Sequence, residues 1–106
     1  MIKIVCPWIL TKNTVAMTVL CFMILRDKSG LEDKSLINHE TIHWRQELET
    51  LIIGFYILYL FFYLKNLITG KVGYEAYRSI PFEKEAFDHQ DDLTYLSKRK
   101  FFAWAR

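Results

Sequence analysis

The chain has 106 residues, which is the usual size of one domain and too short to add a separate regulatory domain. Hydrophobic residues make up 52% of it and aromatic residues 16%, so it is rich in apolar side chains for its length. A formal net charge of +2 at pH 7 is too small for a nucleic-acid-binding surface, and that class of partner is excluded. We therefore expect a single domain over residues 1–106.

Residues 2–26 are rich in Val, Ile, Thr, Phe and Trp, which favour β-strands. Residues 11–13 have the composition of a turn. The sequence therefore predicts a β-hairpin built from about 3–10 and 15–26. A short buried helix over 15–25 is the alternative, because an apolar run alone does not distinguish a strand from a helix.

The N-terminal segment lacks the features of a signal peptide, because no long apolar stretch precedes Pro7. The apolar run 15–25 is followed by Arg26 and not by a small-residue cleavage site. Cys6 and Cys21 are too few for a disulfide framework, and we interpret them as small core residues in a reducing compartment. We expect a cytoplasmic or inner-membrane-associated protein.

A long helix is expected over residues 35–68, which contain no proline and one glycine, Gly54. Ser35 is a favourable N-cap residue, and a bend is expected near Gly54. The part 51–68 carries one charged residue, Lys65, and many aromatic ones, which are typical of membrane interfaces. A bilayer core needs about 20 apolar residues. This part is therefore expected to meet a membrane surface or a partner helix, the alternative being burial against the hairpin or a partner subunit.

A final helix is expected over residues 82–97, because Pro81 is favoured in the first turn of a helix. Two glycines at 70–73 end the preceding helix, and a short segment over 74–78 lies between the two. The predicted fold class is therefore α+β, with an N-terminal β-hairpin, a long helix and a second, C-terminal helix.

The motif His39-Glu-Thr-Ile-His43 is the most specific signal in the chain. Two histidines at positions i and i+4 lie on one helix face, so both imidazoles can reach one metal ion. Neutral imidazole suits zinc, and a catalytic zinc keeps one position for water. Glu40, beside the first histidine, is positioned to take a proton from that water. The sequence predicts one zinc ion with Glu40 as the general base.

A catalytic zinc needs a third protein ligand besides two histidines and water. The last helix begins with two acidic residues, Glu83 and Glu85. These point about 200° apart around a helix, so only one of them can face the metal. Acidic residues in a first helical turn also stabilise the helix without any metal. Either carboxylate therefore remains a candidate at this point.

The sequence carries three runs in order: HETIHWRQ at 39–46, GY at 73–74 and PFEKEA at 81–86. Together, over residues 36–90, they resemble the small bacterial HExxH proteins of the gluzincin type, whose pattern is approximately HExxHxxQ, then GY, then NPxExEA. The resemblance implies a minimal zincin-like fold and a zinc metallopeptidase-like site. It also implies that Glu83 is the third ligand, with Glu85 as the second choice.

Two positions depart from that pattern. Ser79 and Ile80 stand where the family has Asn before the proline, and Phe87 stands where many gluzincins have an Asp that supports a metal-binding histidine. Ligating histidines usually need such a supporting acceptor. The candidates to replace it are Gln46, Glu47, Asn38 and Asp88.

Two functions follow from these residues. The first is a zinc-dependent metallopeptidase or amide hydrolase acting on a peptide or protein substrate, with Tyr77 and Arg78 as donors to an oxyanion. Tyr77 and Arg78 are otherwise a packing tyrosine and a surface arginine. The alternative function is a non-catalytic membrane- or complex-associated component with a structural or vestigial metal site.

Overall fold

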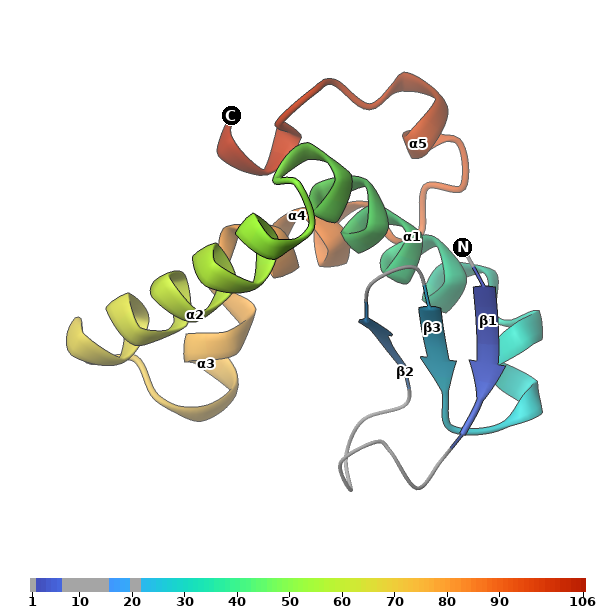
Figure 1. Cartoon of the computed structure of the whole chain (residues 1–106), viewed down its shortest axis with the longest axis horizontal. Helices are drawn as coiled ribbons and strands as arrows, with labels where there is room; N and C mark the ends of the chain where they lie inside the picture. Colours follow the sequence, from blue (N-terminus) through green and yellow to red (C-terminus); the bar gives the residue numbers. More distant parts are fainter. Residues whose placement is uncertain (1, 7–15, 20–21) are drawn as a thin grey trace.

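The protein, described by a computed structural model over residues 2–6, 16–19 and 22–106, consists of a small N-terminal sheet followed by helices (Figure 1). The predicted α+β class is confirmed. Its elements, in chain order, are β1 (Ile2–Val5), β2 (Ala16–Val19), β3 (Phe22–Leu25), η2 (Lys28–Glu32), α1 (Lys34–Glu49), α2 (Ile53–Ile68), α3 (Gly73–Arg78), α4 (Pro81–His89), α5 (Tyr95–Lys98) and η3 (Ala103–Ala105).

The sheet has the strand order β1-β3-β2. β1 is parallel to β3, with Ile2 opposite Phe22, whereas β2 and β3 form an antiparallel pair. The antiparallel pair therefore lies within 15–26, and the predicted pairing of 3–10 with 15–26 as a hairpin is wrong. The predicted turn at 11–13 lies outside the described residues, as does Cys21. Strand β3 is entirely apolar and largely buried, which favours a central position with a neighbour on each side.

The predicted helix over 35–68 is two helices, α1 and α2, with a bend of 108° between them. The N-cap of α1 is Asp33, whose carboxylate accepts a hydrogen bond from the Leu36 amide at 3.1 Å. The predicted N-cap, Ser35, lies inside the first turn and donates its hydroxyl to Asp91 at 2.6 Å. An aspartate two residues earlier therefore competes successfully for the cap position.

The break between α1 and α2 is a Schellman motif just before Gly54, where a bend was expected. The amide of Ile52 donates to the carbonyl of Glu47 at 2.6 Å, and the amide of Leu51 donates to that of Leu48 at 3.4 Å. Leu51 and Ile52 have φ angles of 60° and 65°, in the left-handed region that favours glycine. The backbone turn is thus fixed by helix-terminal hydrogen bonds and not by a glycine.

The last helix is shorter than the predicted 82–97. Pro81 does occupy its first turn, but α4 ends at His89 and α5 follows as a separate turn. The side-chain amide of Asn38 on α1 donates to three carbonyls in this region, those of His89, Gln90 and Asp92. These bonds from α1 hold the chain in a turn where the sequence pattern alone suggested continued helix.

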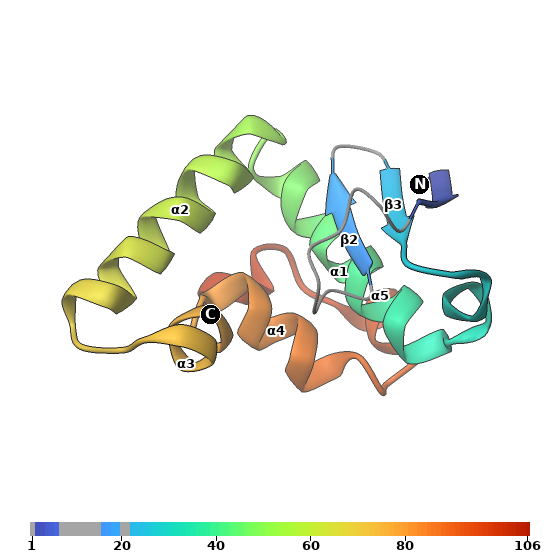
Figure 2. The same ribbon diagram turned by 90° about the horizontal axis from the view of Figure 1, so that it is seen from below.

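Helix α4 packs along α1, and β2 packs on the other side of α1 (Figures 1 and 2). A cluster of aromatic residues around Phe82 joins α4 to α2 and to Trp104 of η3. Within the described ranges, no single helix is long and apolar enough to span a membrane. The bent pair α1 and α2 passes that test jointly, by length and composition alone.

Candidate metal centre

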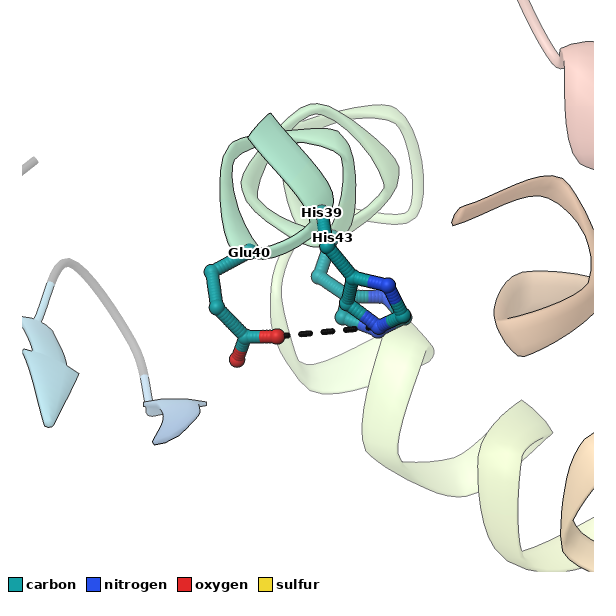
Figure 3. A group of neighbouring side chains, drawn as sticks. All are labelled: His39, Glu40 and His43. Carbon is teal, nitrogen blue, oxygen red and sulfur yellow. Dashed lines mark hydrogen bonds and ion pairs between the residues drawn. The ribbon is translucent and has the colours of Figure 1, made fainter. Parts of the chain in front are cut away.

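Three side chains of α1 form a buried group on one side of the helix: His39, Glu40 and His43 (Figure 3). Each offers one ligand atom, and these atoms all lie within 4.8 Å of one another. The imidazole Nε2 atoms of the two histidines are 3.2 Å apart, and one Glu40 oxygen lies 3.7 Å from Nε2 of His39. A group of this composition and size can hold a metal ion.

Glu83 reaches this group from α4. Its Oε1 atom lies 3.2 Å from Nε2 of His39 and 3.0 Å from Nε2 of His43. Two phenols hold the carboxylate in place: Tyr59 donates to its Oε2 at 2.8 Å and Tyr77 to its Oε1 at 3.2 Å. The three atoms that converge on one point therefore come from two helices.

Gln46 fixes the tautomer of His43. Its side-chain NH₂ donates to the Phe82 carbonyl and to Glu85 Oε1, both at 2.9 Å, so its carbonyl oxygen must face His43. That oxygen lies 2.8 Å from Nδ1 of His43, which therefore carries a proton and donates. Nε2 of the neutral ring is then left with its lone pair facing Glu83.

His39 is supported in the same way by a residue of the turn after α4. Its Nδ1 lies 2.8 Å from the side-chain oxygen of Gln90, where an Nδ1–H donates. Phe87 lies against the His39 ring edge-on, with the ring centroids 4.6 Å apart. Phe87 thus supplies contact without an acceptor, and Gln90 supplies the acceptor three residues further along.

With both Nδ1 protons already donated, the two Nε2 atoms and Glu83 Oε1 are three acceptors facing one another. Such an arrangement requires a cation, which is either a metal ion or a proton shared among them. Burial disfavours a charged His43, but the carboxylates of Glu83 and Glu40 outweigh it and raise its pKa to about 9. Burial likewise opposes ionisation of Glu83, yet the two histidines hold its pKa well below the usual range.

Glu85 points away from this group, toward the C-terminal segment. Its carboxylate accepts hydrogen bonds from Gln46, from the Tyr95 hydroxyl and from Arg99. Arg99 also makes a two-pronged ion pair with Glu49 of α1, both N–O distances being 2.8 Å. Burial opposes ionisation of Glu85, but Arg99 and the other donors lower its pKa. A buried ion-pair network therefore backs the Gln46 side chain that supports His43.

Glu40 faces the sheet. The hydroxyl of Thr18 on β2 lies 3.1 Å from its backbone carbonyl and 3.2 Å from its carboxylate oxygen Oε1. Strand β2 forms one side of the sheet, and among the described strands it pairs with β3 alone. Thr18 thus ties the strand edge to the carboxylate beside His39.

A cleft of about 850 Å³ opens onto this group. Strand β2 forms one wall through Ala16, Met17 and Thr18, and α2, α3 and α4 contribute the aromatic side chains that line the rest. The aromatic residues that line it are Phe55, Tyr56, Tyr59, Tyr74, Tyr77 and Phe87. The floor carries the histidines and both Glu40 and Glu83, so the polar group lies at the bottom of an apolar cleft.

The two residues singled out before the last helix lie in different surroundings. Tyr77 lines the cleft beside Glu83, and burial together with that carboxylate raises the pKa of its phenol, which therefore stays a donor. Tyr59 is in the same state for the same reasons. Arg78 instead lies over the Phe87 ring, 4.2 Å from its centroid, and 3.7 Å from Asp88.

Sequence reasoning missed Gln90, Tyr59 and Thr18 near the group, and Arg99 behind it. Gln90 and Tyr59 come from segments read only as helix pattern and apolar stretch. Asp88, a candidate partner for a histidine, pairs with Arg78. Gln46 was among the candidates, and the i, i+3 spacing of His43 and Gln46 was the available signal.

The fold and site together define an α+β protein with a buried His–Glu–His group that can hold a metal ion. Comparison with models of protein families, with characterised proteins and with solved structures finds no match to this chain.

Proposed function

We propose that the chain is a zinc-dependent metallopeptidase-like hydrolase of peptide or amide bonds. The observation that carries this proposal is the convergence of three acceptors, Nε2 of His39, Nε2 of His43 and Oε1 of Glu83, at 3.0 to 3.2 Å from one another. Two imidazoles and one carboxylate are a donor set that suits zinc with one position open to water.

His39, His43 and Glu83 would hold the zinc, which would supply a Lewis acid that lowers the pKa of water toward about 7. Glu40 takes the proton from the attacking water and returns it to the leaving amine. The phenol of Tyr77 would turn from Glu83 Oε1, where its bond is the longer of the two, and donate to the oxyanion that develops on the carbonyl. Tyr59 keeps its hydrogen bond to Glu83 Oε2. The edge of β2 beside Glu40 provides backbone groups with which an extended peptide can pair.

A non-catalytic protein with a structural metal site is the second candidate, and the network behind the site favours it. Gln46, Glu85 and Arg99 connect His43 to Glu49 at the end of α1 through buried hydrogen bonds. A cation between α1 and α4 would then serve chiefly to fasten the two helices.

The test is metal analysis of the purified full chain together with hydrolysis of a fluorogenic peptide library. We expect one equivalent of zinc in the native chain, no zinc in His43→Ala, and retained zinc in Glu40→Gln. Peptide turnover should be lost in Glu40→Gln and kept in Glu75→Gln, the same change at an exposed position of α3. Circular dichroism of each variant verifies folding, and zinc removal from the native chain by a chelator gives an independent arm.

The two candidates give different results. Zinc binding without peptide turnover, unchanged by Glu40→Gln, supports the structural metal site. A folded native chain that takes up no zinc overturns both.

A further inference from the structure

The side of α2 that faces away from the rest of the protein is apolar. Its exposed side chains recur every three or four residues, which places them on one face about 120° wide. We call this face the outer stripe of α2, and it consists of Ile53, Ile57, Leu60, Phe61, Leu64, Leu67 and Ile68. Exposed fractions within it reach 85% at Ile68. In Figures 1 and 2, α2 forms an arm of the molecule that extends away from the sheet.

The opposite face of α2 is occupied by the fold. Phe55 is buried and stacks on Phe82 of α4, with ring centroids 4.6 Å apart, and Phe62 contacts both Phe82 and Trp104. Asn66 is also buried and donates to the carbonyl of Ala76 in α3 at 2.8 Å. The helix is thus held in one orientation, and the outer stripe is fixed as a surface.

The charged residues within α2 and in the turns that flank it have one sign. Residues 50–74 contain two lysines, Lys65 and Lys71, and no aspartate or glutamate. Lys65 lies in the last turn of α2, where a positive charge also suits the helix dipole, and it is exposed. An apolar stripe with basic residues at one end complements a surface that is apolar inside and negatively charged outside.

Leu51 extends the apolar surface at the start of α2, although its backbone conformation is unfavourable for a leucine. It occupies the left-handed position of the Schellman motif, with φ of 60°, where glycine is favoured. The equivalent position after α2 is Gly70, with φ of 99°, and its motif has the same two hydrogen bonds. The Leu51 side chain is 85% exposed, so it contributes almost nothing inside the fold. A strained and exposed leucine is explained by a partner outside the chain.

We propose that the outer stripe of α2, with Leu51, docks on the surface of an anionic lipid bilayer. The helix has 16 residues and is about 24 Å long, and with one face packed on α4 it lies along the bilayer surface with only the stripe immersed. A second copy of the chain fits less well. A two-fold interface would bring the lysines of both copies to a surface that holds no acidic residue to pair with them. This proposal does not depend on the metal site.

Docking in this orientation places the cleft beside the bilayer. Tyr56 and Tyr59 of α2 line the cleft, while Ile57 and Leu60, their neighbours in sequence, belong to the outer stripe. Segments of polypeptide close to the bilayer surface would therefore be the nearest to the buried His–Glu–His group.

The test is sedimentation of the full chain with lipid vesicles. Vesicles of equal parts phosphatidylglycerol and phosphatidylcholine should bind the chain, and vesicles of phosphatidylcholine alone should bind it much less. The double variant Ile57→Gln with Phe61→Gln should bind the mixed vesicles more weakly by about tenfold or more, because two immersed apolar side chains are lost. Lys65→Gln should weaken binding by about fivefold.

The matched control is Leu31→Gln with Leu93→Gln, two exposed apolar residues outside α2, and it should bind like the native chain. Sedimentation equilibrium reports the oligomeric state in parallel. A native chain that ignores both vesicles, or that forms a dimer abolished by the α2 double variant while binding no lipid, overturns the proposal. Equal binding by the native chain and the α2 double variant overturns it as well.

Discussion

Helices α1 and α2 are equal in length and adjacent in sequence, but α1 buries mainly polar side chains, whereas α2 exposes mainly apolar ones. Apart from Ile42, every buried residue of α1 is polar or titratable. In α2, by contrast, Phe55 and Asn66 are the buried residues, while most of its aliphatic side chains are exposed. Burying polar groups and exposing apolar ones both oppose folding. The difference between the helices agrees with the two sites proposed above, a metal-binding group on α1 and a lipid-binding face on α2.

The buried charges beside α1 need ion-pair partners, and Arg99→Met removes one of these partners. Its guanidinium lies between Glu49 and Glu85, and all three side chains are buried. Removing it leaves two buried carboxylates without their cation, so the free energy of unfolding should fall by about 3–5 kcal/mol. Urea unfolding followed by circular dichroism measures this change.

The control for that change is the neighbouring Lys98→Met, which removes an exposed ion pair with Asp92 and should leave stability nearly unchanged. If the free energy of unfolding falls equally little in both variants, the buried network stabilises the fold no more than an exposed ion pair does.

Acid should weaken the same network, by less than the loss of Arg99. Because Arg99, Gln46 and Tyr95 lower the pKa of Glu85 despite its burial, the folded state favours the ionised carboxylate. The resulting stability is present above the ordinary pKa of a glutamate and is lost as the pH falls through the lowered value. Urea unfolding at pH 7 and at pH values below 4 should show this loss in the native chain. Arg99→Met should be less sensitive to acid, and an identical pH dependence would contradict this assignment.

The proposed metal site on α1 can be tested without changing any of the proposed ligands. Gln90→Leu removes the acceptor at Nδ1 of His39, and zinc affinity should fall roughly 10- to 100-fold, as for other supporting partners of metal-bound histidines. Competition with a chromophoric chelator measures it. Asp88→Asn should leave affinity unchanged, because Asp88 pairs with Arg78 instead of a histidine. A larger effect at Asp88 than at Gln90 would be inconsistent with the hydrogen bonds seen here.

The smallest effect concerns the junction of the two helices. Leu51→Gly should raise the free energy of unfolding by about 0.5–1 kcal/mol, because glycine adopts positive φ without strain and the lost side chain was exposed. The opposite sign is expected for Leu48→Gly, within α1, which should destabilise by about 1 kcal/mol. Thermal or urea unfolding distinguishes them, and destabilisation by Leu51→Gly would mean that the leucine packs within the fold.

Local patterns predicted the parts of the molecule that depend on one element. His39 and His43 share a helix face because their spacing is one turn, and Pro81 begins α4 because its ring suits a first turn. The antiparallel pairing of β2 with β3 was not predicted, because residues 15–26 contain no Gly, Pro or Asn that would indicate a turn. The pairing of β1 with β3 was not predicted either, because it joins two segments that are far apart in the sequence. Such a contact leaves no periodic trace in the sequence.

The other features that the sequence did not predict depend on contacts between different helices. The turn after α4 is held by Asn38 of α1, and it brings Gln90 against His39. The choice between Glu83 and Glu85 as neighbours of the histidines depends on how α4 is rotated against α1, with Arg99 drawing Glu85 to the other side. Helical spacing limited that choice to two residues, but it could not predict how α4 is rotated against α1.

The hydrogen bonds of Gln46 would couple folding to the binding of a metal ion. Its amide takes up the orientation that exposes Nε2 of His43 only when the Phe82 carbonyl and Glu85 on α4 are in place. In a chain where α4 is undocked, the ring is free to present either nitrogen and Glu83 is absent. Any ion that prefers the assembled group must therefore favour the docked state, by RT ln(1 + [ion]/Kd). If the chain binds zinc as proposed, its thermal midpoint should rise with the logarithm of the free zinc concentration, so that thermal unfolding would itself report zinc binding.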